Sequence, residues 1–292
     1  KYIANERLTK SNAAITINQY ESELTNYVIK NWGNRTAATI TRIDANLLLK
    51  DMEVAKKTSV ARRIKTNLSQ VWKFGLNFGY LENNIMHDLI LTGAKAEKDR
   101  ALNADEIKQF FNSLHHLKSR NCIDILRLIL LLGRRPLEVA SAKWSDIDLE
   151  SKNWFVETAK QRANKKVKDG IIIPLPDLAY SIFLGRFVEN HLSDYVFQSE
   201  YDLLKHHTVH AVSQELNRKF DKLGITEPFT PHDLRRTCST LLGKLDFDQE
   251  EIDRILGHKI VGISSIYNRH DYVEQRLKAL TKLDAEIKRI IT

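Results

Sequence analysis

The sequence Thr-Pro-His-Asp-Leu-Arg-Arg-Thr at residues 230–237 combines a helix start with two side chains that can bind an anion. A threonine before a proline, with an aspartate three positions later, is typical of a capped helix N-terminus in which Thr230 is the N-cap and Asp233 completes a capping box. His232 and Arg235 are three residues apart and therefore share one helix face near the positive end of the helix dipole. Such a face suits a phosphate and the negative charge that develops on it during a reaction.

A second arginine motif, Gly-Arg-Arg-Pro-Leu-Glu at residues 133–138, precedes this helix in the chain. It follows the almost continuously apolar stretch 123–132, which predicts a buried helix. Arg135 is thus expected at the edge of the core, where Glu138 can orient its guanidinium group. Taken by itself, the motif is better explained by an ordinary ion pair at a helix end.

Two motifs follow on the C-terminal side. Asp248 and Glu251 are expected to cap a short helix that ends at Gly257, which places His258 at a defined corner. Tyr267 lies nine residues beyond His258. A lone histidine after a glycine, or a lone tyrosine, is usually structural, so the order of all the motifs carries the interpretation.

These motifs resemble the catalytic domain of the tyrosine recombinases, or phage integrases. The family pattern is an arginine in G-x-R-x-x-E, then H-x-L-R, then L-G-H, then a tyrosine about nine residues later. The resemblance extends in motif detail from Leu102 to the C-terminus, and residues 58–86 are similar to the core-binding helices of integrases from temperate phages and genomic islands. It implies a mainly α fold with a small β-sheet, in which a helical core-binding domain and a catalytic domain form a C-shaped clamp.

The resemblance also implies a role for each motif residue. Arg135 and Arg235 would clamp the scissile phosphate, and His232 and His258 would donate hydrogen bonds or move protons. Tyr267 would attack the phosphorus and form a 3′-phosphotyrosyl bond. Because a tyrosyl leaving group with a pKa of about 10 departs readily, the strand can be resealed without ATP. The implied chemistry requires neither a metal ion nor a nucleotide cofactor.

A lysine in a β-hairpin is the general acid of the resembling family. Residues 154–158 and 171–175 are expected to form two strands joined by a loop rich in lysine and arginine. Counted back from Pro174, Lys166 best matches the family spacing, and its neighbour Lys165 is interpreted as a DNA contact.

Three alternatives concern neighbouring residues. Tyr272 is a second candidate nucleophile, although its distance from His258 fits the family less well. Arg134 and Arg236 are expected to be structural or to contact backbone. The histidine-containing stretch 206–210 lacks cysteine or carboxylate partners at metal-ligand spacing and is interpreted as a loop entering a helix.

Charge and periodicity indicate a DNA-binding N-terminal part. Residues up to Glu97 contain 14 basic and 9 acidic side chains, whereas the remainder contains 31 and 28, for a net charge of +8. An amphipathic helix is expected over 58–80, and its basic residues outside the apolar stripe are either a solvated surface or phosphate contacts. We assign as DNA contacts Arg62, Arg63, Lys65 and Lys73.

We expect a helical core-type DNA-binding domain at 1–92, a linker at 93–100 and the recombinase catalytic domain at 101–292. Cys122 and Cys238 lie far apart in helical patterns and indicate no disulfide framework, which favours a reducing cytoplasm. A DNA-binding protein is expected there at the nucleoid. No apolar run approaches transmembrane length. The first residue is a lysine rather than a methionine, which leaves room for an upstream module.

The favoured function is integration and excision of a prophage or genomic island. The expected partners are double-stranded DNA attachment sites, three further copies in a homotetramer on paired sites, and DNA-bending accessory proteins. The alternatives are a catalytically inactive DNA-binding protein with the same fold and, with a poorer match of motif order, a type IB topoisomerase. An apolar stripe at 276–292 indicates a final helix. Periodicity favours packing on its own domain, whereas the resemblance favours its exchange between subunits.

Overall fold

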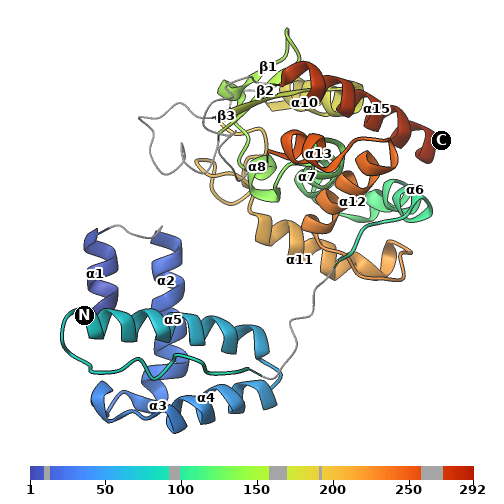
Figure 1. Ribbon diagram of the computed structural model, residues 1–292. Coiled ribbons are helices and arrows are strands. Elements are labelled where there is room, and N and C mark those ends of the chain that lie inside the picture. Colours follow the sequence, from blue (N-terminus) through green and yellow to red (C-terminus); the bar gives the residue numbers. More distant parts are fainter. Residues whose placement is uncertain (10–13, 92–98, 158–169, 191–192, 258–271) are drawn as a thin grey trace. The chain divides into compact units, whose positions relative to one another are not determined.

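A computed structural model of the 292-residue chain forms two compact units, Lys1–Glu97 and Lys98–Thr292 (Figure 1). The structure describes residues 1–9, 14–91, 99–157, 170–190, 193–257 and 272–292. Below, the two units are called the first unit and the second unit, and each is described by itself.

The first unit is built from helices and short turns. In chain order they are α1 (Tyr2–Thr9), α2 (Ala14–Glu23), a π-helical turn (Leu24–Ile29), α3 (Lys30–Trp32), a 3₁₀ turn (Ala37–Thr39), α4 (Arg42–Val54) and α5 (Thr58–Asn77). Helix α4 begins at a capping box in which the Asp44 backbone N–H donates to the Thr41 hydroxyl at 3.2 Å. Its apolar face packs against α5 around Leu49, Ile64 and Leu68, all at most 2% exposed.

The second unit is mainly helical. Its helices and helical turns are α6 (Ala104–Ser113), Leu114–His116, α7 (Arg120–Leu132), α8 (Pro136–Ala140), Trp144–Asp146, α10 (Asp177–Asn190), α11 (Val209–Lys219), Phe220–Lys222, α12 (Pro231–Lys244), α13 (Gln249–Leu256) and α15 (Val273–Ile291). The predicted buried helix is confirmed as α7, which contacts α8, α10, α11, α12 and α15. It is the central element around which the unit packs.

A three-stranded antiparallel sheet completes this unit. Its strands are β1 (Ile147–Asp148), β2 (Asn153–Glu157) and β3 (Gly170–Pro174), in the order β1-β2-β3. Trp154 pairs with Ile173, and both are buried. The two strands expected from the sequence are therefore confirmed with a shift of one residue, and the short strand β1 was not predicted. The predicted mainly α fold with a small sheet is confirmed.

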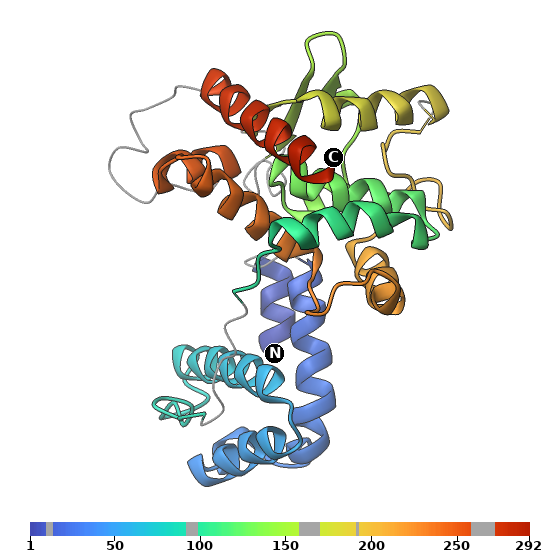
Figure 2. The same cartoon turned by 90° about the vertical axis from the view of Figure 1, so that its right-hand side faces the viewer.

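The C-terminal helix α15 packs on its own unit. It lies beside β3 and α6, as the red helix in Figures 1 and 2 shows, and Ala279, Leu283 and Ile287 are fully buried. In the single chain the apolar face of α15 forms part of the core of its own unit, as its periodicity favours. Exchange of this helix between subunits on paired DNA sites stays a prediction. Within the described residues, no helix is both long and apolar enough to cross a membrane.

Two substitutions on α15 test this packing. Leu283 is fully buried and Leu277 is 47% exposed on the same helix. We expect Leu283→Ala to lower the free energy of unfolding by about 2–5 kcal/mol and Leu277→Ala to change it by at most about 0.5 kcal/mol. Urea denaturation at several protein concentrations measures both. A loss that depends on protein concentration would instead show that α15 is exchanged between copies.

Candidate active site

The start of α12 has the geometry that the sequence predicts. The Thr230 backbone N–H donates to the Asp233 carboxylate at 2.8 Å, and the Thr230 hydroxyl donates to the same oxygen at 2.7 Å. Pro231 occupies the first helical turn, where its missing N–H costs nothing. His232 is exposed at this N-terminus, and Arg235 lies one turn further along the helix.

Arg235 is held by two backbone carbonyls from different segments. Its Nη1 donates to the carbonyl of Gly133, and its Nη2 donates to the carbonyl of Leu256 at 3.1 Å. The side chain is buried, at 4% exposure. Burial, and then the positive charge of Arg135, lowers the pKa of Arg235. The guanidinium group is therefore fixed in orientation and lies within electrostatic reach of Arg135.

Arg135 is oriented by Glu138, as expected. Its backbone N–H donates to one oxygen of Glu138 at 3.1 Å, and its Nη1 donates to the other at 2.9 Å. The Arg135 side chain is 46% exposed, whereas that of Glu138 is 4% exposed. Burial acts to raise the pKa of Glu138, but Arg134 and Arg135 outweigh it and lower that pKa. A buried, ionised carboxylate thus anchors an arginine whose other edge faces outward.

The turn between α7 and α8 requires Gly133. Its φ of +61° lies in the left-handed region, and an added Cβ would lie 2.4 Å from Leu256 Cδ2 and 2.8 Å from Cys238 Sγ. The turn can therefore approach α12 and α13 closely only because this residue has no side chain. This close approach also brings the Gly133 carbonyl to Arg235.

The end of α13 is contacted by three arginines from three segments. Arg134 Nη2 donates to the Ile255 carbonyl at 2.5 Å, Arg235 donates to the Leu256 carbonyl, and Arg276 Nε lies 3.4 Å from the Arg254 carbonyl. Sequence reasoning missed Arg276, because no local pattern links a residue of α15 to the end of α13.

The neighbouring residues that were set aside have structural contacts. Arg134 is fully buried and bonds to backbone, which confirms its interpretation, and Arg236 forms an ion pair with Asp233 at 2.5 Å. Tyr272 is the N-cap residue of α15, and its ring centroid lies 4.8 Å from the Arg254 guanidinium. His207, from the stretch once considered for metal binding, lies 3.4 Å from Cys122 Sγ.

The remaining predicted residues lie outside the described residues. They are Lys165, Lys166, His258 and Tyr267. Of the predicted catalytic set, His232 and Arg235 lie three residues apart on α12, and Arg235 is bonded to the carbonyl of Gly133, two residues before Arg135.

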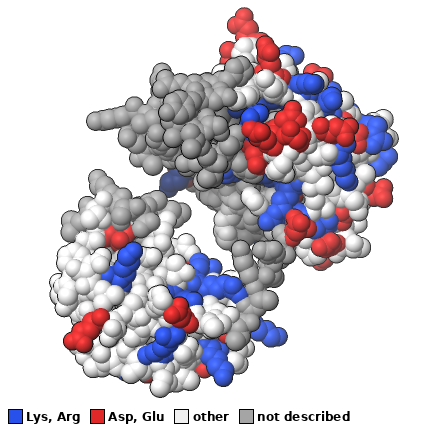
Figure 3. Space-filling view, viewed as in Figure 1, with Lys and Arg blue, Asp and Glu red and all other residues white. Residues whose placement is uncertain are grey.

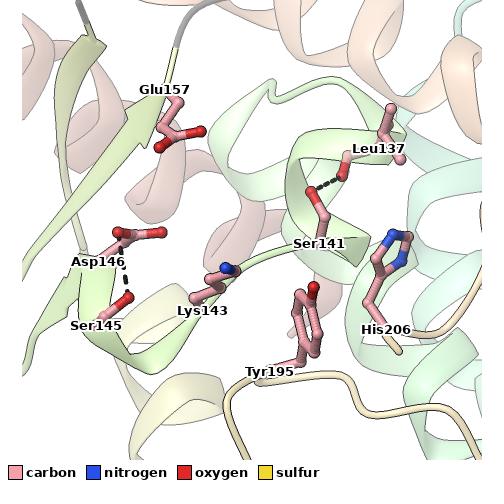
Figure 4. A pocket seen from close by; sticks show the side chains of 8 residues that line it. All are labelled: Leu137, Ser141, Lys143, Ser145, Asp146, Glu157, Tyr195 and His206. Atoms are coloured by element: carbon pink, nitrogen blue, oxygen red, sulfur yellow. Dashed lines mark hydrogen bonds between the residues drawn. The ribbon is translucent and has the colours of Figure 1, made fainter. Parts of the chain in front are cut away.

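A separate cavity of about 400 Å³ lies beside α8 (Figure 4). Its lining residues are Leu137, Ser141, Lys143, Ser145, Asp146, Glu157, Tyr195 and His206. Arg135, Arg235 and His232 are not among the residues that line this cavity.

In the first unit, two of the predicted DNA contacts have internal partners. Arg63 Nε donates at 2.6 Å to Glu23, whose side chain is 8% exposed, and Lys65 donates to the Leu89 carbonyl. Lys73 is exposed, and Arg62 is half-buried. On the face shown in Figure 3, acidic and basic side chains are interspersed on the second unit, so no patch of one sign identifies a DNA surface there.

Comparisons with known proteins agree on one family. The model described as the phage integrase family matches residues 100–274, and the model described as the phage integrase central domain matches residues 1–91. Together they cover both units.

Individual relatives are distant. The chain is 24% identical over 247 residues to prophage integrase IntA of Escherichia coli K12, covering 82% of this chain and 57% of that protein. It is 24% identical over 271 residues to tyrosine recombinase XerC of Oceanobacillus iheyensis, covering 89% and 87%. The chain thus spans less than two thirds of the length of the first of these relatives.

Solved structures share the fold. A lambda integrase (residues 75–356) dimer bound to a COC′ core site superposes with a TM-score of 0.71 at 19% identity, covering 89% of this chain and 94% of that one. The Tn1549 transposon integrase in complex with circular intermediate DNA gives 0.68 at 16%, covering 95% and 96%.

The effect of the surrounding arginines on the pKa of His232 can be tested. Loss of hydration, then Arg236 and Arg235, lowers the pKa of His232. We expect NMR titration to place this pKa below the ordinary value of about 6.5, and Arg236→Gln to raise it. Lys244→Gln, at the other end of the helix, is the control and should leave it unchanged. Because the folded pKa lies below the unfolded one, the contribution of His232 to stability is lost as the pH falls below about 6.5. An unchanged pKa in Arg236→Gln would contradict this electrostatic account.

Proposed function

The chain belongs to the phage integrase family, and we propose that it is a site-specific DNA recombinase that cuts and rejoins DNA through a 3′-phosphotyrosyl intermediate. The observation that carries this proposal is the arrangement at the start of α12, where Arg235 follows His232 by three residues and donates to the carbonyl of Gly133, two residues before Arg135. Each arginine is oriented by partners of its own, one by Glu138 and the other by two backbone carbonyls. An intact set of this kind argues against the catalytically inactive alternative.

The arrangement suits phosphoryl transfer because the transition state carries extra negative charge on its non-bridging oxygens. Fixed guanidinium groups can donate to those oxygens without reorganising during the reaction. The lowered pKa of His232 favours its neutral form near pH 7, in which one ring nitrogen can accept a proton.

We assign the bond-making steps to residues outside the described part of the chain by their match to the family motifs. The Tyr267 hydroxyl gives its proton to one of the two histidines, His232 or His258, as its oxygen attacks phosphorus. The bond to the 5′-oxygen breaks, and that oxygen takes a proton from Lys166. His258 assists at the phosphate. Attack by a 5′-hydroxyl then reverses these steps, which releases the tyrosine and reseals the strand.

For the whole protein we propose that residues 1–92 bind the core of a DNA attachment site and that residues 101–292 perform catalysis. Lambda integrase has been solved as a dimer bound to a core site and as a tetramer bound to a Holliday junction. By this likeness, we assign to the chain double-stranded attachment sites, a tetramer on paired sites and DNA-bending accessory proteins as partners. The proposed role is integration and excision of a prophage or genomic island, in the cytoplasm at the nucleoid.

Removal of one hydroxyl tests the proposed nucleophile. Tyr267→Phe should abolish the covalent protein–DNA complex and leave DNA affinity within about twofold, because only the attacking oxygen is lost. A nicked suicide substrate followed by denaturing electrophoresis measures the complex. Tyr272→Phe is the matched control and should retain it. A covalent complex in Tyr267→Phe that disappears in Tyr272→Phe would move the nucleophile to Tyr272.

Salt dependence tests the DNA-binding face of α5. Lys73 is exposed on α5. We expect Lys73→Gln to make the plot of log affinity against log salt concentration shallower by about 0.9, which is the contribution of one phosphate contact.

The matched control is Arg63→Gln/Lys65→Gln, because these two side chains already bind Glu23 and Leu89 within the unit. We expect its salt slope to stay unchanged while its thermal stability falls. Fluorescence anisotropy with labelled DNA at several salt concentrations measures both variants. A slope that becomes shallower only in the control would reverse the assignment.

A further inference from the structure

The end of α13 concentrates positive charge to an unusual degree. Its last three carbonyls, those of Arg254, Ile255 and Leu256, are each contacted by a different guanidinium group, from Arg276, Arg134 and Arg235. The final carbonyls of a helix have no partner within the helix, and cations there are favoured by the helix dipole. Three guanidinium groups from three separate segments thus meet at one helix end.

Burying the charged Arg134 side chain to bind one carbonyl costs free energy of desolvation. The side chain is fully buried, and burial lowers its pKa to about 9. Its Nη1 has no hydrogen-bond partner in the part of the chain that the structure describes. Well-packed apolar side chains often replace buried ions without loss of stability. The charge at this position is therefore better explained by what it positions than by the stability that it adds.

The contacts of Arg134 lead to Arg235 in two steps. Arg134 holds the Ile255 carbonyl, and the next carbonyl along the chain, that of Leu256, accepts from Arg235. The other anchor of Arg235 is the carbonyl of Gly133, the residue that directly precedes Arg134. Arg134 joins the turn after α7 to the end of α13, and each of these two segments supplies one of the carbonyls that hold Arg235.

Arg276 acts on the same helix end from the opposite direction. Its Nη1 donates to the Ile172 carbonyl of β3 at 3.1 Å, and its Nε reaches the Arg254 carbonyl. The side chain is 4% exposed. It therefore links the sheet and α15 to the helix end that carries the Leu256 carbonyl.

We propose that Arg134 and Arg276 are positioning residues that fix the end of α13 so that the Leu256 carbonyl holds Arg235 in its reactive orientation. This inference rests on the proposed function for its effect on DNA cleavage, but its structural part concerns the free protein. A displacement of about 1 Å at a reacting group can cost on the order of 10²-fold in rate.

The first experiment compares the buried Arg134 with Arg186, an arginine of the second unit whose side chain is 12% exposed. Arg134→Met should slow single-turnover cleavage at saturating DNA by on the order of 10²-fold and leave DNA affinity within about twofold. The matched control is Arg186→Met. Arg186 also has a buried Nη2 without a partner among the described residues, and it binds Asp124 at 2.8 Å and Asn121 at 2.9 Å. The control should lose stability and keep its cleavage rate. Equal rates in Arg134→Met and wild type would overturn the proposal.

Double variants separate positioning from a general structural role. If Arg134 acts through Arg235, then Arg134→Met should add little to the loss already caused by Arg235→Ala. If the double variant instead loses the product of the two single-variant rate factors, the two arginines act independently, and the proposal is overturned. Arg276→Met provides the same test through the Arg254 carbonyl, and it replaces Arg134→Met if that variant does not fold.

A measurement on the free protein distinguishes failure of this inference from failure of the proposed function. The Arg235 Nε–H signal in ¹⁵N NMR should shift or broaden in Arg134→Met and in Arg276→Met, but not in Arg186→Met. An unchanged signal in both variants would sink the positioning role even if the wild type cleaves DNA. If the signal shifts in these variants but the wild-type protein forms no covalent DNA complex, the positioning role stands and the recombinase function is rejected.

Discussion

The two hydrogen bonds from Arg235 to backbone carbonyls are the constraint on which the candidate site depends. They join the turn after α7 to the end of α13, and they come from a helix, α12, that packs on α7. Side-chain acceptors would leave rotamer freedom in the partner, whereas carbonyls at two helix ends are fixed by the backbone. A small error in the packing of α7, α12 or α13 would therefore change the direction of this guanidinium group.

The same arrangement places three arginines near the carboxylate of Glu138. Arg134, Arg135 and Arg235 lie close enough to affect neighbouring pKa values, and Glu138 is the carboxylate that both Arg134 and Arg135 stabilise in its charged form. Burial first, and the neighbouring positive charges second, lower the pKa values of Arg134 and Arg235. A bound phosphate would offset that repulsion, so the site is arranged for an anion before the anion arrives.

Local chemistry explains which features could be predicted from the sequence. The start of α12 and the end of α13 depend on residues within one turn of each other, such as Thr230 with Asp233 and the glycine at position 257, and these predictions are confirmed. The pairing of Glu138 with Arg135 is local in the same sense. The hairpin strands follow from residue type and alternation over five residues.

Most of the features that sequence reasoning missed depend on contacts between distant segments; the short strand β1, which pairs with the neighbouring strand β2, is an exception. Arg63 was treated as available to DNA, but its partner Glu23 lies 40 residues earlier, and a periodic pattern carries no information about such a partner. The same holds for Arg276, which lies 22 residues from the carbonyl of Arg254 that it contacts. The choice between self-packing and exchange of α15 also depended on whether a complementary apolar surface exists in the same unit, which only the fold reveals.

The contacts of α13 extend this argument to the nucleophile. The described residues that flank the stretch 258–271 are both fixed to this helix: Gly257 ends it in a left-handed conformation with φ +70°, and the Tyr272 ring packs on its Arg254. An added Cβ on Gly257 would lie 2.8 Å from Ile171 Cδ1 of β3, so this end is also packed against the sheet. The two described residues on either side of this stretch therefore both contact α13, the helix whose last carbonyl orients Arg235.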